Sequence, residues 1–262
     1  MEYSYTRSLI QELYILAHEN IQIRKGIFDI QEKLFGNGLI WDTSDNDPEQ
    51  NQLIKDFQSW SVSSNISGVS LIGVLKDLEW DLNVCDHAYL EVFRKKSESK
   101  LIQIRRLHPA LVELDLNKKS GLPGETHFLC SACEDENIYT APERCQSCET
   151  ELVPSYYKYY HRGRYIYFGK DGIIELSNQL PYNRMLFFLI PDRPDHSGKE
   201  FDGIMVGDNK TKPFMIDQII KDDRKAINEI ILKRLSEEFG VWNNKIFIPD
   251  SNLVHKDKIK TF

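Results

Sequence analysis

Apolar residues recur at steps of three and four in the first and last thirds of the chain, which is the spacing of amphipathic helices. Near the N-terminus this pattern runs without a gap to a Gly-Asn-Gly sequence, so it predicts one long first helix. The predicted helices are residues 8–35, about 49–60, a third from Ser67 or Ser70 to about Val84, and 214–239. We therefore expect helices at both ends of the chain.

The middle of the chain alternates apolar and polar residues instead, which is the period of a strand. Two alternating runs around a charged turn predict one β-hairpin, and two tyrosine-rich runs around His161-Arg162-Gly163 predict another. The predicted strands are 88–94, 101–107, 111–116, 156–160, 164–168, 173–176 and 185–190. This order of elements predicts an α+β fold with helices at both ends and central β-hairpins.

Four of the five cysteines lie within nineteen residues, as two C-x-x-C pairs separated by eleven residues. Each pair places two thiolates on one tight turn, and two such turns complete the tetrahedron that zinc accepts. The predicted ligands are Cys130, Cys133, Cys145 and Cys148. Because four thiolates leave no position for water or substrate, we expect one structural Zn2+ in a ribbon; a redox pair and an iron–sulfur cluster are the alternatives.

The cysteine segment divides the sequence into three expected regions. These are a helical and hairpin region at 1–120, an inserted zinc ribbon at 121–154, and a β-hairpin and C-terminal helix region at 155–262. Between residues 134 and 151 the ribbon carries six acidic residues and one basic residue, Arg144. This balance disfavours direct contact between the ribbon tip and nucleic acid, because phosphates would be repelled.

A second candidate site is the stretch of tyrosine and basic residues that follows the ribbon. Aromatic rings can stack on bases while arginine and lysine hold phosphates, so this stretch is a candidate nucleic-acid or subunit interface. Its candidate residues are Tyr157, Lys158, Tyr159, Arg162, Arg164, Tyr165 and Tyr167. The alternative is a structural hairpin whose tyrosines cover the edge of a core. Strand alternation predicts that Ile166 and Phe168 are buried and that Tyr165 and Tyr167 face outward.

Composition narrows the class of protein. The 262 residues are 41% hydrophobic and 28% charged, which excludes a wholly disordered chain. The formal net charge of -7 argues against a globally basic coat for nucleic acid. There is no run of about 18 apolar residues and no signal-peptide core, so we expect a chain that is neither secreted nor embedded in a membrane.

No familiar catalytic motif is present, neither a phosphate-binding glycine loop nor a nucleophile elbow nor a zinc-protease helix. The Asp-rich loop at 191–208, with Asp192, Asp195, Asp202 and His196, is the best place for an enzyme site. Asp77, Glu79 and Asp81 should point in different directions around a helix, so we do not expect them to converge on one site. A site at Asp208, Asp222 and Asp223 has no more support in the sequence than one in this loop. Cys85 lies beside Asp86 and His87, but we expect it to be a buried thiol without chemistry.

Residues 66–115 carry an order of elements that resembles the N-terminal half of tailed-virus portal proteins. There, a helix leads into a short "GNAYIE"-like strand, a charged hairpin and an "L-x-x-L-x-P-x-x-V" strand. The matching residues are Asp86, Ala88, Tyr89, Leu90, Glu91, Val92, Ile104, Leu107, Pro109 and Val112. The likeness covers about residues 5–116. Cys85-Asp86-His87 replaces the usual Gly-Asn, and the ribbon and the short C-terminal part also depart from the family pattern.

The resemblance implies a ring-forming, usually dodecameric, channel through which DNA is packaged. It implies a homo-oligomer with terminase, capsid protein and double-stranded DNA as partners, in the virion or the host cytoplasm, and no catalytic residues. Two other functions stay open. One is a monomeric zinc-ribbon protein that binds nucleic acid or a protein partner, and the other is an enzyme that uses the Asp-rich loop.

Overall fold

The computed structural model of the chain describes residues 6–44, 47–63, 68–95, 100–133, 138–140, 144–177, 184–188, 200–201, 204–205 and 211–250. The helices are α1 (Arg7–Glu19), α2 (Ile21–Phe35), α3 (Pro48–Ser61), α4 (Leu71–Cys85), α5 (Met185–Phe188), α6 (Thr211–Ala226) and α7 (Lys233–Glu238), with the 3-10 turns η1 (Pro109–Leu111) and η2 (Lys170–Gly172) and the π-helical turn η3 (Ile227–Leu232). The strands are β1 (Ile40–Trp41), β2 (His87–Lys95), β3 (Lys100–Leu107), β4 (Val112–Leu114), β5 (Phe128–Cys130), β6 (Ile138–Tyr139), β7 (Leu152–Pro154), β8 (Tyr157–His161), β9 (Arg164–Phe168), β10 (Ile173–Ser177), β11 (Glu200–Phe201), β12 (Ile204–Met205) and β13 (Ile246–Phe247). Helices at both ends with small antiparallel sheets between them confirm the α+β prediction.

The first predicted helix is broken into two at Asn20, so the prediction of one helix over 8–35 was wrong. The Asn20 side-chain oxygen accepts hydrogen bonds from the N–H groups of Gln22, at 2.9 Å, and Ile23, at 3.2 Å. The Asn20 N–H donates to the Leu16 carbonyl at 2.9 Å. Asn20 thus ends α1 and caps α2 with one residue, and the apolar spacing carries no sign of the break because it continues on both sides.

Helix α4 is the central element of the fold. It begins at Ser70, whose hydroxyl accepts a hydrogen bond from the Gly73 N–H at 3.2 Å, which confirms one of the two predicted caps. Most of its residues are buried, including the polar ones in its second half. It ends at Asp86, which adopts a left-handed conformation with φ 63 and turns the chain into β2.

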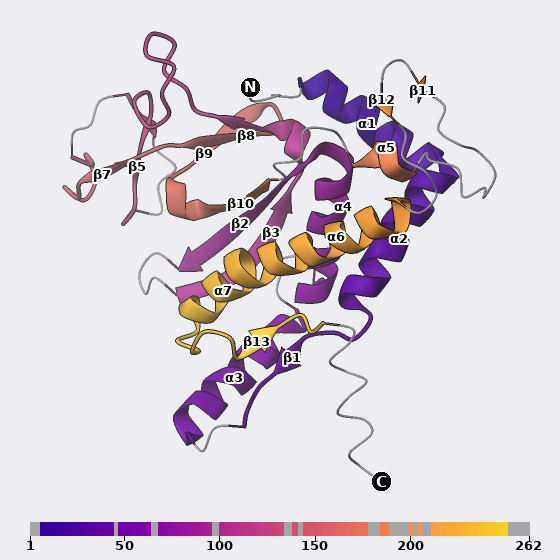
Figure 1. Cartoon of the computed structure of the whole chain (residues 1–262). Coiled ribbons are helices and arrows are strands. Elements are labelled where there is room, and N and C mark those ends of the chain that lie inside the picture. Colours follow the sequence, from indigo (N-terminus) through magenta and orange to yellow (C-terminus); the bar gives the residue numbers. More distant parts are fainter. Residues whose placement is uncertain are drawn as a thin grey trace.

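The first predicted hairpin is confirmed and forms the main sheet. Strands β2 and β3 pair antiparallel, and β2 also pairs with β10 from beyond the ribbon, in the order β10-β2-β3. Figure 1 shows this sheet at the centre, with α1, α2 and α4 on one side and β5 and β7 on the other. Segments far apart in the sequence therefore build one sheet.

The second predicted hairpin is also confirmed. Strands β8 and β9 pair around a turn at Arg162 and Gly163, whose φ values of 48 and 85 suit a tight two-residue hairpin turn. The third predicted strand became β4, which pairs with β8 rather than with the first hairpin. Leu107, Tyr159, Phe168 and Ile173 form a small apolar cluster between the two sheets.

The C-terminal helix follows the predicted range, through α6, η3 and α7 in succession. Its apolar face joins the main core of α1, α2 and α4, and in Figure 1 it runs across the central sheet. Beyond it, β13 pairs with β1, and the Phe239 ring stacks on Phe57 of α3 with ring centroids 4.5 Å apart. No helix among the described residues is both long and apolar enough to cross a bilayer.

The predicted strand at 185–190 was wrong, because residues 185–188 form the short helix α5; residues 189–190 lie outside the described part. Met185 and Phe188, three residues apart, lie buried on one face of this turn. The Phe188 ring fits against Gly26 of α2, where any Cβ would overlap it. The apolar run therefore forms a helical turn whose Phe188 ring fits into the space that Gly26 leaves on α2.

Candidate metal centre

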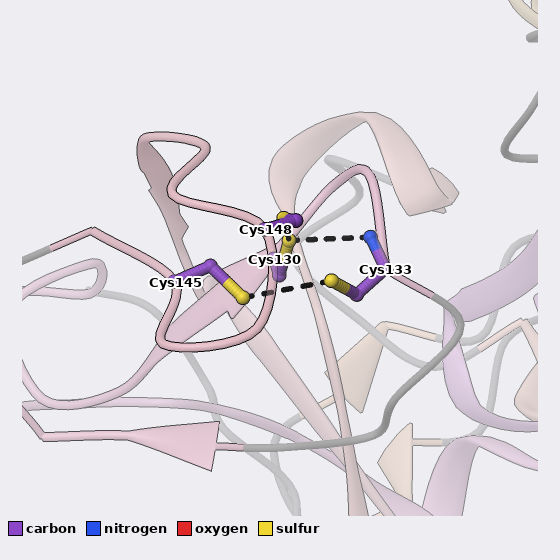
Figure 2. Close-up of side chains that lie close together, drawn as sticks. All are labelled: Cys130, Cys133, Cys145 and Cys148. Atoms are coloured by element: carbon purple, nitrogen blue, oxygen red, sulfur yellow. Dashed lines mark hydrogen bonds between the residues drawn. The ribbon is translucent and has the colours of Figure 1, made fainter.

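The four predicted cysteine ligands come together in the structure. Their sulfur atoms all lie within 4.8 Å of one another, with Cys130 and Cys148 at 3.4 Å and Cys133 and Cys145 at 3.6 Å. Figure 2 shows the four side chains converging. Four thiolates in a tetrahedron around zinc, with Zn–S near 2.3 Å, would be about 3.8 Å apart. None of the cysteines is in a disulfide. The cluster is thus compatible with a metal site.

Backbone geometry positions each pair of sulfurs. Cys130 ends β5, and its sulfur accepts a hydrogen bond from the Cys133 N–H at 3.2 Å. In the second pair, the Cys145 sulfur accepts hydrogen bonds from the N–H groups of Ser147 and Cys148. Both C-x-x-C segments therefore turn their N–H groups toward their first sulfur. Such donors favour the charged form of a thiol, which is the form that binds metal.

A small three-stranded sheet holds the two turns in place. Its order is β6-β5-β7, so Cys130 lies on the central strand. Phe128 and Leu152 are buried beside Cys130 and Cys145 and form a cluster of their own. This cluster is far smaller than the main core. A bound metal would supply much of the folding free energy that so few apolar residues cannot supply.

The thiols differ in their electrostatics without metal. The pKa of Cys145 is lowered to about 6, first by a hydrogen bond from the Tyr139 hydroxyl and then by backbone N–H groups. The pKa of Cys148 is lowered, chiefly by hydrogen bonding to the Thr150 side chain. The pKa of Cys133 is raised, because it shares hydrogen bonds with the neighbouring sulfurs. The sulfurs thus share protons, which a metal ion would displace.

The structure divides the candidate residues of the tyrosine and arginine hairpin between its two faces. Tyr159 is buried in the cluster between the sheets, and the Tyr157 hydroxyl donates to Glu175 at 2.9 Å. These two tyrosines therefore have structural contacts on the inner face. Phe168 is buried and Ile166 half-buried on the same face, as the alternation predicted.

The remaining candidates lie on the outer face or at the tip. The Lys158 ammonium group pairs with Glu113 at 3.1 Å and lies 5.0 Å from the centre of the Tyr165 ring. Tyr165 is exposed, as predicted, and Tyr167 is half-buried with its ring 4.5 Å from the ring of His127. Arg162 and Arg164 are both exposed beside the turn. The tip of the hairpin thus carries two exposed arginines, and the lysine on its outer face pairs with Glu113.

Sequence reasoning missed a network of buried charges around α4. Asp81 is fully buried and receives the Arg106 guanidinium and the Tyr14 hydroxyl. Burial raises the pKa of Asp81 to about 6, and the hydrogen bonds and charge of Arg106 oppose this shift by stabilising the charged carboxylate. Of the three acidic residues that point in different directions around α4, Asp81 is therefore held inside the fold by Arg106 of β3.

Glu79 belongs to a second buried group on another side of α4. Arg184 is buried and pairs with Asp223 of α6 through hydrogen bonds of 2.6 and 2.7 Å. The pKa of Glu79 is raised well above its ordinary value, first by burial and then by the Asp223 carboxylate. Asp223 is thus a structural partner, and Asp222 is exposed and bonds to Gln218. The one signal in the sequence was the presence of acidic residues inside an otherwise apolar helix.

Cys85 is buried as predicted, and its thiol donates to the carbonyls of Asp81, at 3.3 Å, and His87, at 3.4 Å. Burial raises the pKa of Cys85 to about 12, and the nearby Asp81 carboxylate adds to this. The thiol is therefore uncharged at neutral pH. The candidates of the Asp-rich loop, Asp192, Asp195, His196, Asp202 and Asp208, lie outside the described residues.

No protein-family model and no curated protein matches the chain. A solved structure described as the neck of an empty GTA particle computed with C6 symmetry has a partial likeness. The TM-score is 0.42 and the identity 14%, over 79% of this chain and 55% of that chain. The chain therefore spans about half the length of the solved chain. A likeness at this level assigns no function.

Proposed function

We propose that the chain is a portal-like structural protein of a virus or provirus, which assembles into a ring for DNA packaging. The supporting observation is the order of elements that the resemblance predicted. In the structure α4 leads into β2, the hairpin closes with β3, and η1 at Pro109 leads into β4. The solved particle-neck chain is in keeping with a role in a particle but does not carry the proposal.

The partners in this proposal are further copies of the chain, a terminase, a capsid protein and double-stranded DNA, and its place is the virion or the host cytoplasm. A protein that works in an assembly needs surfaces for its neighbours. The helices α1 and α2 expose large apolar side chains, with Ile15 56%, Ile21 69% and Phe28 51% exposed. Exposed apolar side chains of this size are in keeping with contacts to other subunits.

The oligomeric state tests the proposal. Light scattering on a sizing column should give a mass many times that of one chain, and negative-stain images should show rings. A monomer or dimer at high protein concentration would overturn it. Salt-sensitive binding of such a monomer to single strands would then favour the zinc-ribbon alternative.

We infer that the four thiolates bind one structural Zn2+ and that residues 121–154 fold as a zinc-dependent unit. The sulfur spacing fits tetrahedral coordination, and four thiolate donors suit zinc. The bound ion would stabilise the fold and, with its coordination closed, would activate no water. Cys130, Cys133, Cys145 and Cys148 would hold it.

Metal analysis of protein purified without added zinc should give about one equivalent per chain. The Cys145→Ser variant should lose the metal and become sensitive to proteases within 121–154. Cys85→Ser is the matched control, because it removes a cysteine outside the cluster and should keep the metal. Wild-type protein that is fully stable without metal would refute the zinc assignment.

A further inference from the structure

A tyrosine hydroxyl reaches the metal-binding cluster from the short strand between the two cysteine pairs. Strand β6 pairs with β5 so that Tyr139 lies directly opposite Phe128. Residues directly opposite in an antiparallel pair share a face, and residues two apart on one strand also share a face. Tyr139 therefore lies on the same face as Cys130. Its hydroxyl oxygen is 3.4 Å from the Cys145 sulfur.

A second hydroxyl reaches the cluster from the residue that closes the other turn. The Cys145 N–H donates to the Thr150 carbonyl at 2.9 Å, and this bond fixes Thr150 next to the second cysteine pair. The Thr150 hydroxyl oxygen is 3.2 Å from the Cys148 sulfur. When the thiol has lost its proton to bind metal, this hydroxyl can donate a hydrogen bond to the thiolate.

We propose that Tyr139 and Thr150 are positioning residues of the zinc centre, whose hydroxyls donate one hydrogen bond each to the thiolates of Cys145 and Cys148. This rests on the zinc assignment made above. Both ligands of the second cysteine pair thus have a side-chain donor. In the first pair, the Cys130 sulfur has a backbone donor, the Cys133 N–H.

The negative charge of the proposed zinc centre explains why such hydrogen-bond donors would stabilise it. Four thiolates around one Zn2+ leave a net charge of about minus two at the centre. Glu149 and Glu151 are exposed on the same segment and add negative charge, against one described basic residue of the ribbon, Arg144. Neutral hydroxyl donors reduce the electron density on the sulfurs without an ion pair. They also orient the ligands, as partners of metal ligands generally do.

Removal of a hydroxyl should have two separable effects. Loss of a hydrogen bond to a metal ligand costs about 10- to 100-fold in metal affinity. It also raises the energy of the sulfur electrons, so charge transfer from sulfur to a bound Co2+ needs less energy. The second effect reports the hydrogen bond itself, because a loosened fold alone would weaken binding without moving that absorption band in a fixed direction.

The experiment uses the full chain, loaded with Zn2+ for affinity and with Co2+ for spectroscopy. Tyr139→Phe and Thr150→Val remove the hydroxyls and keep the shape of the side chains. Each should weaken Zn2+ binding about 10- to 100-fold in competition with a chelator and shift the sulfur-to-Co2+ band to longer wavelength. Tyr156→Phe is the control, because Tyr156 packs near Gly124 and makes no hydrogen bond with a cysteine among the described residues.

The outcomes separate this inference from the zinc assignment. If wild-type protein binds one Zn2+ and both variants match it in affinity and spectrum, the positioning role is refuted. Weaker binding with an unmoved band also refutes it, because it shows a packing role only. If wild-type protein binds no zinc, the zinc assignment fails first. Band shifts in the two variants and none in Tyr156→Phe would support the inference.

Discussion

The Asp81 carboxylate, fully buried in the middle of α4, receives the guanidinium of Arg106 from β3. The Arg106 Nε donates to Asp81 at 2.6 Å, an Nη2 hydrogen bond joins it, and the Tyr14 hydroxyl of α1 donates to the same carboxylate. This one carboxylate therefore links a helix, its neighbour and the central sheet. A buried charge held in this way stabilises the fold only while its partners are present.

We expect Arg106→Met to lower the free energy of unfolding by about 3–5 kcal/mol, because it leaves Asp81 buried without its countercharge. Urea unfolding followed by circular dichroism measures this change. The double variant Asp81→Asn with Arg106→Met should recover part of the loss, since no uncompensated charge then remains.

Lys33→Met is the control for this prediction. Lys33 pairs with Asp217 at 3.7 Å, and both side chains are exposed, 56% and 73%. A surface pair of this kind contributes about 0–1 kcal/mol. Equal losses for Lys33→Met and Arg106→Met would show that the buried pair has no special role.

His108 should make the stability of the protein depend on pH. Its Nδ1 accepts a hydrogen bond from the Ala110 N–H at 3.2 Å and caps η1. Burial, and then the Arg106 charge, lower the pKa of His108 to about 4. Between the ordinary histidine pKa and this value, the unfolded chain binds more protons than the folded chain does. The free energy of unfolding therefore falls as the pH falls through this range.

The variant His108→Asn keeps a cap that accepts a hydrogen bond but cannot take up a proton. Because His108 is half-buried, we expect the wild type to lose about 1–2 kcal/mol more than the variant between pH 7 and pH 4.5. The His108 ring also lies 4.4 Å from the Tyr14 ring, centroid to centroid, and the variant loses this contact at every pH. Unfolding curves across this range therefore test the difference in slope between the wild type and the variant. Parallel slopes would show that His108 does not titrate in this window.

Cys85 should be unreactive in the folded protein. Its burial and raised pKa keep the thiol protonated at pH 8 and out of reach of reagents. After zinc is removed with a chelator, iodoacetamide should modify the exposed Cys148, and should modify Cys85 only in urea. Peptide mass spectrometry follows both sites in one sample. Rapid modification of Cys85 in the folded protein would contradict this prediction and indicate a reactive thiol.

The cysteine cluster could be predicted from the sequence because a C-x-x-C pair is a local motif of four consecutive residues. Its two sulfurs are fixed by one turn, so Cys130 and Cys133 need no knowledge of the rest of the fold. The two hairpins were predictable for the same reason, since alternation and a turn residue such as Gly163 lie next to each other in the chain.

The features that could not be predicted from the sequence depend on contacts between residues that are far apart in the chain. The helical turn at Met185 exists because Gly26, far away in the sequence, leaves room for Phe188. Arg106 and Arg184, the partners of Asp81 and Asp223, lie far from them in the sequence, and the spacing of acidic residues along a helix does not reveal them. Asn20 is a different case, because its type suits a helix cap although the apolar spacing on both sides predicts one continuous helix.

The last prediction concerns the tip of the tyrosine and arginine hairpin. Arg162 and Gly163 form the turn with positive φ, and Arg164 lies opposite His161 at the end of β9. Both arginines are exposed beside this turn. The tip therefore presents two positive charges at the protein surface. In a portal-like ring, we propose that these arginines contact DNA.

Reversal of both charges, with Arg162→Glu and Arg164→Glu, should lower the affinity of the assembled protein for double-stranded DNA by about tenfold or more at low salt. It should also reduce the slope of log affinity against log salt by up to about 2, because two phosphate contacts are lost. Fluorescence anisotropy over a salt series measures both quantities. The matched control is Lys118→Glu with Lys119→Glu, which makes the same change in net charge at two exposed lysines in the loop before the ribbon. If both double variants weaken binding equally, only net charge matters. If the arginine variant binds DNA and assembles like the wild type, the hairpin is a structural element only.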